Sequence, residues 1–102
     1  YQAVEDSACS KLTSMLPEDL RPDYEPFFVP AQVDAPLWPL VKAADKISAL
    51  AKCMEEEKAG NREFIRAKSA LLASIHAMRL PEAECFLAEF LPGYALTLDE
   101  LE

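Results

Sequence analysis

One long helical segment limits the folds open to this chain: PLWPLVKAADKISALAKCMEEEKAGN, residues 36–61. Residues that favour helices fill it, and no glycine interrupts it before Gly60. The pattern predicts one helix from about Pro36 to Ala59, with Gly60 as a left-handed stop and Asn61 as the N-cap of the next helix. A helix of this length has to bury one face, so we expect a core built from helices.

The part of the chain that precedes this segment is divided by prolines. Residues 1–16 carry apolar side chains at helical spacing, and this helix should end before Pro17, because a residue that precedes proline disfavours the α conformation. Pro17 then suits the first position of a second short helix. The FFV run between Pro26 and Pro30 predicts a short helical turn, followed by an irregular connection through Asp34.

The part after residue 61 also reads as helix. Residues 62–80 and 81–91 are predicted helices, the second opened by Pro81. Thr97 and Glu100 have the spacing of a capping box, which predicts a final capped turn. No β-type alternation of useful length is present, so the fold class is all-α. The apolar residues expected to face inward are Phe64, Ala67, Leu71, Leu72 and Ile75, then Cys85, Phe86, Ala88, Phe90 and Leu91.

Size and charge limit the function. The 102 residues, 51% of them hydrophobic, suit a single helical unit over residues 1–102. The net charge of −8, with no stripe of lysine and arginine, argues against a nucleic-acid polymer as partner. No run approaches the roughly 20 apolar residues that span a membrane, so we expect no membrane association. Cys9, Cys53 and Cys85 lie far apart, which suggests reduced, mostly buried thiols and a cytoplasmic location.

Asp45 is the candidate for chemistry on the long helix. The residues expected to form its apolar arc are Leu37, Leu40, Val41, Ala44, Ile47, Ser48, Ala51 and Met54. Asp45 falls roughly 40° beyond the edge of this arc at Val41. Two interpretations stay open: a solvated boundary carboxylate, paired with Lys42, Lys46 or Lys52, or a carboxylate that ligates a cation.

The other candidates favour structural roles. His76 is the only histidine and lacks partners at metal-ligand spacing. Glu55, Glu56 and Glu57 radiate around the helix as a solvated face. No serine or threonine has the setting of a nucleophile, and no glycine-rich phosphate loop is present. The larger aromatic residues suit the core and interfaces, and they are Phe27, Phe28, Trp38, Phe64, Phe86, Phe90 and Tyr94. The residues alone therefore give a helical chain without a self-sufficient active site.

Longer stretches carry a resemblance to a known family. LVKAADKISALAKCMEEEKAGNREF (residues 40–64), LPEDLRPDYEPF before it and FLPGYALTLDEL after it resemble the later part of bacterial 5'-deoxynucleotidases of the HD superfamily, the YfbR-like proteins. Nearly the whole chain is covered. The resemblance implies the helical C-terminal part of an HD-domain phosphohydrolase, which releases phosphate from deoxyribonucleoside 5'-monophosphates.

The resemblance also implies a metal site. The family holds a divalent ion, of Co²⁺ or Mn²⁺ type, with a histidine, an adjacent His-Asp pair and a distant aspartate in a V-K-x-A-D setting. Asp45 matches that last ligand. This chain has no His-Asp dipeptide, and His76 follows Asp45 instead of preceding it. We therefore expect no catalytic or cofactor-binding residue within the chain, and no activity from it alone.

Two functions follow from this. The first is the C-terminal part of a deoxynucleotidase, whose partners are the deoxyribonucleoside 5'-monophosphate, the missing N-terminal half and a second copy in a homodimer. The alternative is a non-catalytic helical protein-interaction module. Its expected self-association surface lies around Phe64 to Ile75 and Cys85 to Phe90. Metal dependence separates the two functions, because the module needs no metal.

Overall fold

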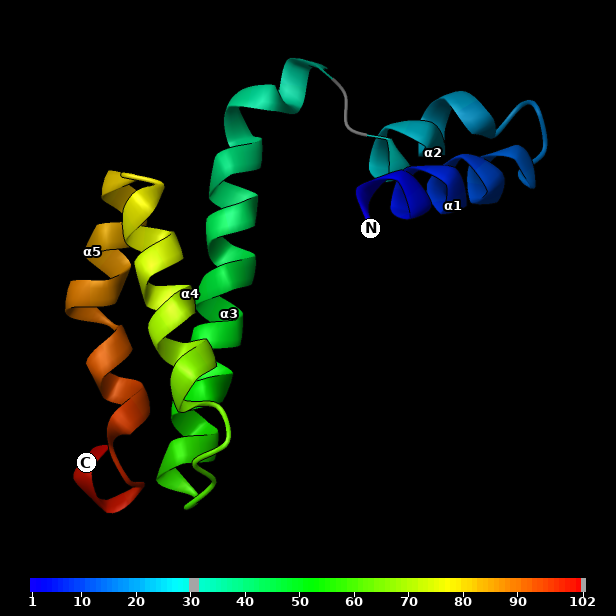
Figure 1. The fold of residues 1–102 in the computed structure, drawn as a ribbon. Helices are drawn as coiled ribbons and strands as arrows, with labels where there is room; N and C mark the ends of the chain where they lie inside the picture. Colours follow the sequence, from blue (N-terminus) through cyan, green and yellow to red (C-terminus); the bar gives the residue numbers. More distant parts are fainter. Residues whose placement is uncertain (30–31, 102) are drawn as a thin grey trace. The chain divides into compact units, whose positions relative to one another are not determined.

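The computed structural model describes residues 1–29 and 32–101, and every regular element within these ranges is helical (Figure 1). The all-α prediction is therefore confirmed. The chain divides into two compact units, Tyr1–Pro36 and Leu37–Glu102. Within the described ranges no helix combines the length and the apolar character needed to cross a membrane.

The first unit is a pair of helices, α1 (Gln2–Ser14) and α2 (Arg21–Phe28). The prediction that Pro17 opens the second helix is wrong. The Pro17 carbonyl accepts hydrogen bonds from the backbone N–H groups of Leu20 and Arg21, at 3.0 and 3.2 Å, and this forms a turn. The Arg21 guanidinium then donates to the carbonyls of Leu16 and Ser14, at 2.9 and 2.8 Å. These bonds occupy backbone acceptors at the end of α1 and just after it, next to the start of α2.

The connection between the units is more regular than expected. Phe27 and Phe28 belong to α2, which contains Pro26, and Val29 adopts an extended conformation. Pro30 lies outside the described residues. The predicted irregular connection through Asp34 is instead a 3₁₀-helix, η1 (Gln32–Leu37).

The second unit begins with α3 (Trp38–Lys58), close to the predicted span. Gly60 has a φ of +91° and ends the helix, as predicted. Its N–H donates to the Glu57 carbonyl at 3.0 Å, and the Asn61 N–H donates to the Glu56 carbonyl at 2.9 Å. This pair of bonds is a Schellman motif.

Asn61 therefore serves the end of α3, and the prediction that it caps the next helix is wrong. Its side-chain oxygen accepts a hydrogen bond from the Glu63 N–H at 3.0 Å, which makes a local turn. The next helix, α4 (Ile65–Ala77), begins after Phe64 and has no side-chain cap.

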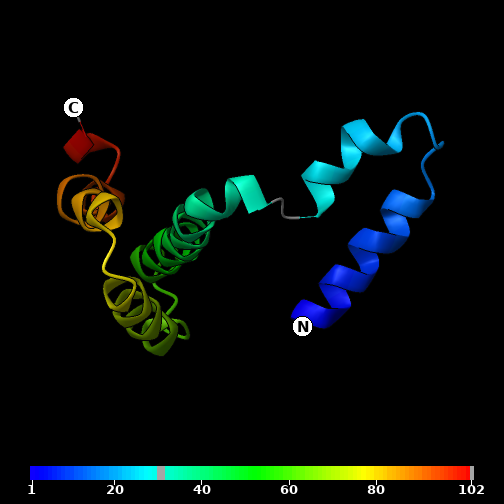
Figure 2. The same cartoon turned by 90° about the horizontal axis from the view of Figure 1, so that it is seen from above.

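Three helices form the core of this unit. The third is α5 (Pro81–Glu89), opened by Pro81 as predicted, and each of α3, α4 and α5 contacts the other two (Figures 1 and 2). Leu50 of α3 and Ile75 of α4 are the largest fully buried side chains. The rest of the buried cluster is small: Ala43, Ala83 and Leu87.

The chain ends in two 3₁₀-helices, η2 (Leu91–Ala95) and η3 (Asp99–Leu101). The predicted capping box is confirmed. The Thr97 N–H donates to the Glu100 carboxylate at 2.6 Å, and the Glu100 N–H donates to the Thr97 hydroxyl at 3.4 Å. These contacts lower the pKa of Glu100 below 4.5, and the hydrogen bond from the Thr97 backbone N–H is the largest cause.

Candidate metal-ligand site

The buried face of α3 differs from the apolar arc expected from the sequence. Ala43, Leu50 and Cys53 are the buried residues of this helix, whereas Val41, placed at the edge of the expected arc, is 52% exposed. At about 100° per residue, the centre of the observed face is rotated by about 120° from the expected one. The expected arc was wrong in part: Ile47 packs against the buried cluster, whereas Val41, Ala44 and Ser48 are exposed. Alanines lie on several sides of this helix, so the spacing of apolar residues leaves its orientation open.

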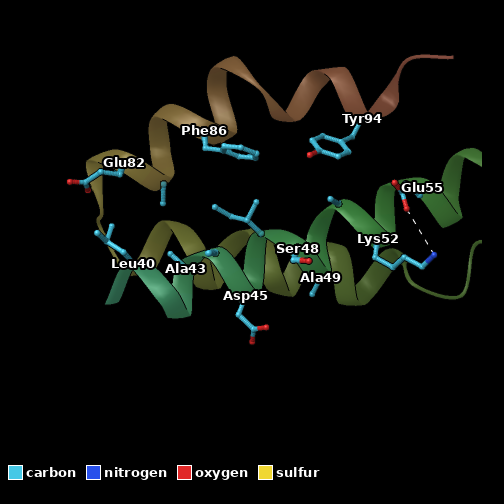
Figure 3. Close-up of a pocket in the computed structure, with 14 residues that line it drawn as sticks. Leu40, Ala43, Asp45, Ser48, Ala49, Lys52, Glu55, Glu82, Phe86 and Tyr94 are labelled. Atoms are coloured by element: carbon cyan, nitrogen blue, oxygen red, sulfur yellow. Dashed lines mark ion pairs between the residues drawn. The ribbon is translucent and has the colours of Figure 1, made fainter. Parts of the chain in front are cut away.

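The rotation places Asp45 on the outer side of α3. It lies about 140° around the helix from Leu50 and is exposed. Its carboxylate points away from Phe86 and Tyr94 of the neighbouring elements (Figure 3). Asp45 forms no hydrogen bond or ion pair with any residue of the described ranges 1–29 and 32–101.

Two of the three lysines expected beside Asp45, Lys46 and Lys52, have other contacts. Lys52 pairs with Glu55 and Glu56, at 3.9 and 3.7 Å, on the exposed surface. The Lys46 ammonium donates a hydrogen bond to the Ser74 hydroxyl of α4. These contacts turn both cations away from Asp45, so its carboxylate is left accessible to a ligand from outside the described residues.

An open groove of about 820 Å³ lies between α3, α5 and η2 (Figure 3). Asp45 is one of its lining residues. Phe86 of α5 and Tyr94 of η2 form the aromatic wall opposite α3. The remaining lining residues are Leu40, Ala43, Ala44, Ile47, Ser48, Ala49, Ala51, Lys52, Glu55, Glu82 and Ala83.

Phe86 and Tyr94 were expected in the core and interfaces, and nothing in the sequence placed them together. It gave no role to Glu82. No local signal connects these residues, because α5 and η2 reach the groove only through the packing of the helices. Three carboxylates, Asp45, Glu55 and Glu82, and a single cation, Lys52, line the groove.

The other candidates lie apart from Asp45. The His76 Nδ1 atom is 2.8 Å from a Glu84 oxygen, and this pair joins α4 to α5 at a partly exposed position. The acidic run is exposed or half-buried, and Glu57 pairs with Lys68 at 2.6 Å. All three cysteines are free, but only Cys53 is buried, and Cys85 is exposed. The expectation of mostly buried thiols is therefore wrong for Cys85.

The described residues bring no metal cluster together. Nowhere in residues 1–29 and 32–101 do three histidine, cysteine, aspartate or glutamate side chains gather in a way that could hold an ion. Asp45 offers one oxygen-bearing ligand, whereas divalent ions in proteins take four or more ligands. The geometry therefore fits one contribution to a metal site and does not fit a complete one.

Comparison with known proteins identifies the family. Residues 1–94 match the model of the YfbR-like 5'-deoxynucleotidases. The chain is 42% identical over 101 residues to a 5'-deoxynucleotidase of Vibrio vulnificus (strain CMCP6), covering 99% of this chain and 56% of that protein. It is 41% identical to the 5'-deoxynucleotidase YfbR of Escherichia coli (strain SMS-3-5), with 99% and 51% covered. This chain belongs to the YfbR-like 5'-deoxynucleotidase family. It spans about half the length of these relatives.

Proposed function

We propose that residues 1–102 are the C-terminal part of a metal-dependent, HD-domain 5'-deoxynucleotidase, to which they supply one metal ligand, Asp45. The observation that supports this proposal most is the family match over residues 1–94, which includes the V-K-x-A-D setting of Asp45. The exposed position of Asp45, without a partner among the described residues, is compatible with a ligand that a metal ion completes.

The role of this chain in the reaction is to hold a carboxylate in place. Asp45 lies in the interior of α3, seven residues after Trp38, where the backbone is fixed by helical hydrogen bonds. Leu50 against Ile75, and Lys46 against Ser74, hold α3 on α4. A bound divalent ion of Co²⁺ or Mn²⁺ type supplies water activation and charge stabilisation at the phosphoryl group. A ligand on a packed helix suits this chemistry, because the geometry of a metal site has to be held closely.

The proposed substrate is a deoxyribonucleoside 5'-monophosphate, hydrolysed to a deoxynucleoside and phosphate in the cytoplasm. The isolated chain should be inactive, because it contains no His-Asp dipeptide and offers a single carboxylate at this position. The further partners proposed are the missing N-terminal half and a second copy in a homodimer.

A chimaera tests this function. Residues 1–102 replace the matching segment of the Escherichia coli relative, and phosphate release from dAMP is measured with added Co²⁺. We expect activity that a chelator removes and Co²⁺ restores. Asp45→Ala should lower this activity by at least about 100-fold, the scale of losing a catalytically important group. Glu89→Ala is the matched control, because Glu89 is also an exposed helical carboxylate and forms no ion pair with a described residue.

Two outcomes would overturn the proposal. Near-normal phosphate release by the Asp45→Ala chimaera would show that Asp45 is not a metal ligand. Activity that survives the chelator in the unmodified chimaera would show that the reaction does not need a metal ion.

The helical interaction module remains the second candidate, favoured by exposed apolar side chains on the second unit. Phe64 and Phe90, at the ends of the expected self-association surface, are 41% and 58% exposed. A module of this kind binds its partner equally well with and without the chelator, whereas the enzyme needs the ion.

A further inference from the structure

We infer that the hydrogen bond between Lys46 of α3 and Ser74 of α4 positions the Asp45 carboxylate, because it fixes how α3 is rotated against α4. Lys46 and Ser74 are then positioning residues, and neither touches the metal ion or the substrate. This inference rests on the proposed function and deepens it. The proposed function assigns the ligand, and the inference assigns the contact that sets the ligand's direction.

Lys46 lies on the packing face of α3 although it carries a charge. It follows Ala43 by three residues and precedes Leu50 by four, and both of these residues are buried. Residues at these spacings share one side of a helix. The Lys46 side chain is half-buried there, and its ammonium donates to the hydroxyl of Ser74, which directly precedes the fully buried Ile75. The bond therefore crosses the helix interface beside its core.

Stability alone does not account for a lysine at this position. Within residues 1–29 and 32–101 no carboxylate pairs with Lys46, so the Ser74 hydroxyl is the partner that the structure gives its ammonium. Removing a cation from water is costly, and an apolar side chain of similar length would pack here without that cost. What the polar pair adds is direction, because a hydrogen bond forms only over a narrow range of distances and angles.

The apolar contacts of α3 constrain its rotation weakly. Its buried residues are Ala43, Leu50 and Cys53, two of which are small. Apolar burial has no preferred direction, and small side chains give shallow ridges for a neighbouring helix to lock into.

Two side-chain hydrogen bonds join α3 to α4 among the described residues. The pair of Lys68 and Glu57 lies at the surface, twelve residues beyond Asp45 and so about 18 Å further along the helix. An exposed pair of this kind contributes little. The bond between Lys46 and Ser74 is half-buried and begins one residue from Asp45. It is therefore the directional contact that acts where the ligand lies.

A small rotation of α3 is large on the scale of a metal site. Side-chain atoms lie about 5–6 Å from the axis of a helix, so a rotation of about 10° moves them by about 1 Å. Metal–ligand distances keep within about 0.2 Å of their preferred values. Asp45 is about 100° around the helix from Lys46, so a bond that fixes Lys46 on α4 also fixes where the Asp45 carboxylate points (Figure 3).

A double substitution that removes both partners tests this inference. In the chimaera with the Escherichia coli relative, Lys46→Met together with Ser74→Ala leaves neither partner unpaired, so the midpoint of thermal unfolding should stay within about 5 °C of the parent. The Co²⁺ affinity, measured by isothermal titration, should fall about tenfold, the scale on which outer-shell groups affect metal sites. Loss of a nearby positive charge would by itself strengthen cation binding, so the sign of the change separates positioning from electrostatics.

Single substitutions on α4 test the part played by the hydroxyl. Ser74→Thr keeps a hydroxyl at this position and should bind Co²⁺ as tightly as the parent, whereas Ser74→Ala should bind it about tenfold more weakly. Ser69→Ala is the matched control and should leave the affinity unchanged. Ser69 is an exposed serine of the same helix, and its side chain forms no hydrogen bond with a described residue.

Three results would overturn the inference. The first is an unchanged or higher Co²⁺ affinity in the double variant, and the second is equally weak binding by Ser74→Thr and Ser74→Ala. The third is a loss of affinity in the double variant together with a fall of more than about 5 °C in its unfolding midpoint, since the bond would then act through stability.

Asp45→Ala separates failure of this inference from failure of the proposed function. If Asp45→Ala loses Co²⁺ affinity and the double variant keeps it, the inference alone is wrong. If Asp45→Ala binds Co²⁺ like the parent, both are wrong.

Discussion

Replacing Leu50 with alanine tests which face of α3 is buried, because Leu50 belongs to the buried face of the structure and not to the apolar arc expected from the sequence. Leu50 is 1% exposed and belongs to one core cluster with Ile75, which is fully buried. Loss of the side chain removes its burial energy and leaves a cavity, which together cost about 3 kcal/mol. The whole free energy of unfolding of a unit of this size is roughly 3–10 kcal/mol, so this loss is large.

The assay is urea unfolding of the isolated chain followed by circular dichroism. With a slope of about 1 kcal/mol per molar urea, Leu50→Ala should lower the midpoint by about 3 M or leave the unit unfolded in buffer. Val41→Ala is the matched control. Val41 is 52% exposed, and alanine favours the helix, so its midpoint should stay within about 0.5 M of the parent. Equal losses from the two substitutions would refute the assignment of the buried face.

Two further predictions concern the ends of elements. Gly60→Ala should lower the free energy of unfolding by about 1–2 kcal/mol in the same assay, because φ is +91° there. Gly93→Ala should cost nothing measurable, since no atom lies within 4 Å of the added Cβ and φ is not in the left-handed region; equal costs at both sites would contradict the backbone argument. In a carboxyl NMR titration, Glu100 should show a pKa below 4.5, and Thr97→Pro, which lacks the donating N–H, should raise it. Because the folded-state pKa is depressed, this contact stabilises the C-terminal turn above about pH 4.5 and is lost as the pH falls through the folded pKa; a value of 4.5 or higher would contradict it.

The elements themselves could be predicted from local chemistry. Gly60 ends α3 and Pro81 opens α5 because left-handed backbone and a missing N–H act within one turn of the chain. The capping box at Thr97 and Glu100 has the same local origin. The prediction failed at Pro17, where a less local contact forms. The Arg21 side chain donates a hydrogen bond to the carbonyl of Ser14, seven residues earlier in the sequence.

The orientation of α3 could not be predicted in the same way. Apolar and small residues lie on most sides of this helix, and only contact with Ile75 and Leu87 selects the face that carries Leu50. The groove was missed for this reason, since residues counted as buried line an exposed surface.

Binding of the ion is the most direct test of the proposal that this chain supplies a metal ligand from the outer side of α3. Co²⁺ binding to the chimaera is measured by isothermal titration, for the parent and for Asp45→Ala and Glu89→Ala. The account predicts one ion per chain for the parent and for Glu89→Ala, and a loss of affinity of at least about tenfold for Asp45→Ala, the scale on which even outer-shell groups affect metal sites. Unchanged Co²⁺ affinity in Asp45→Ala would contradict it.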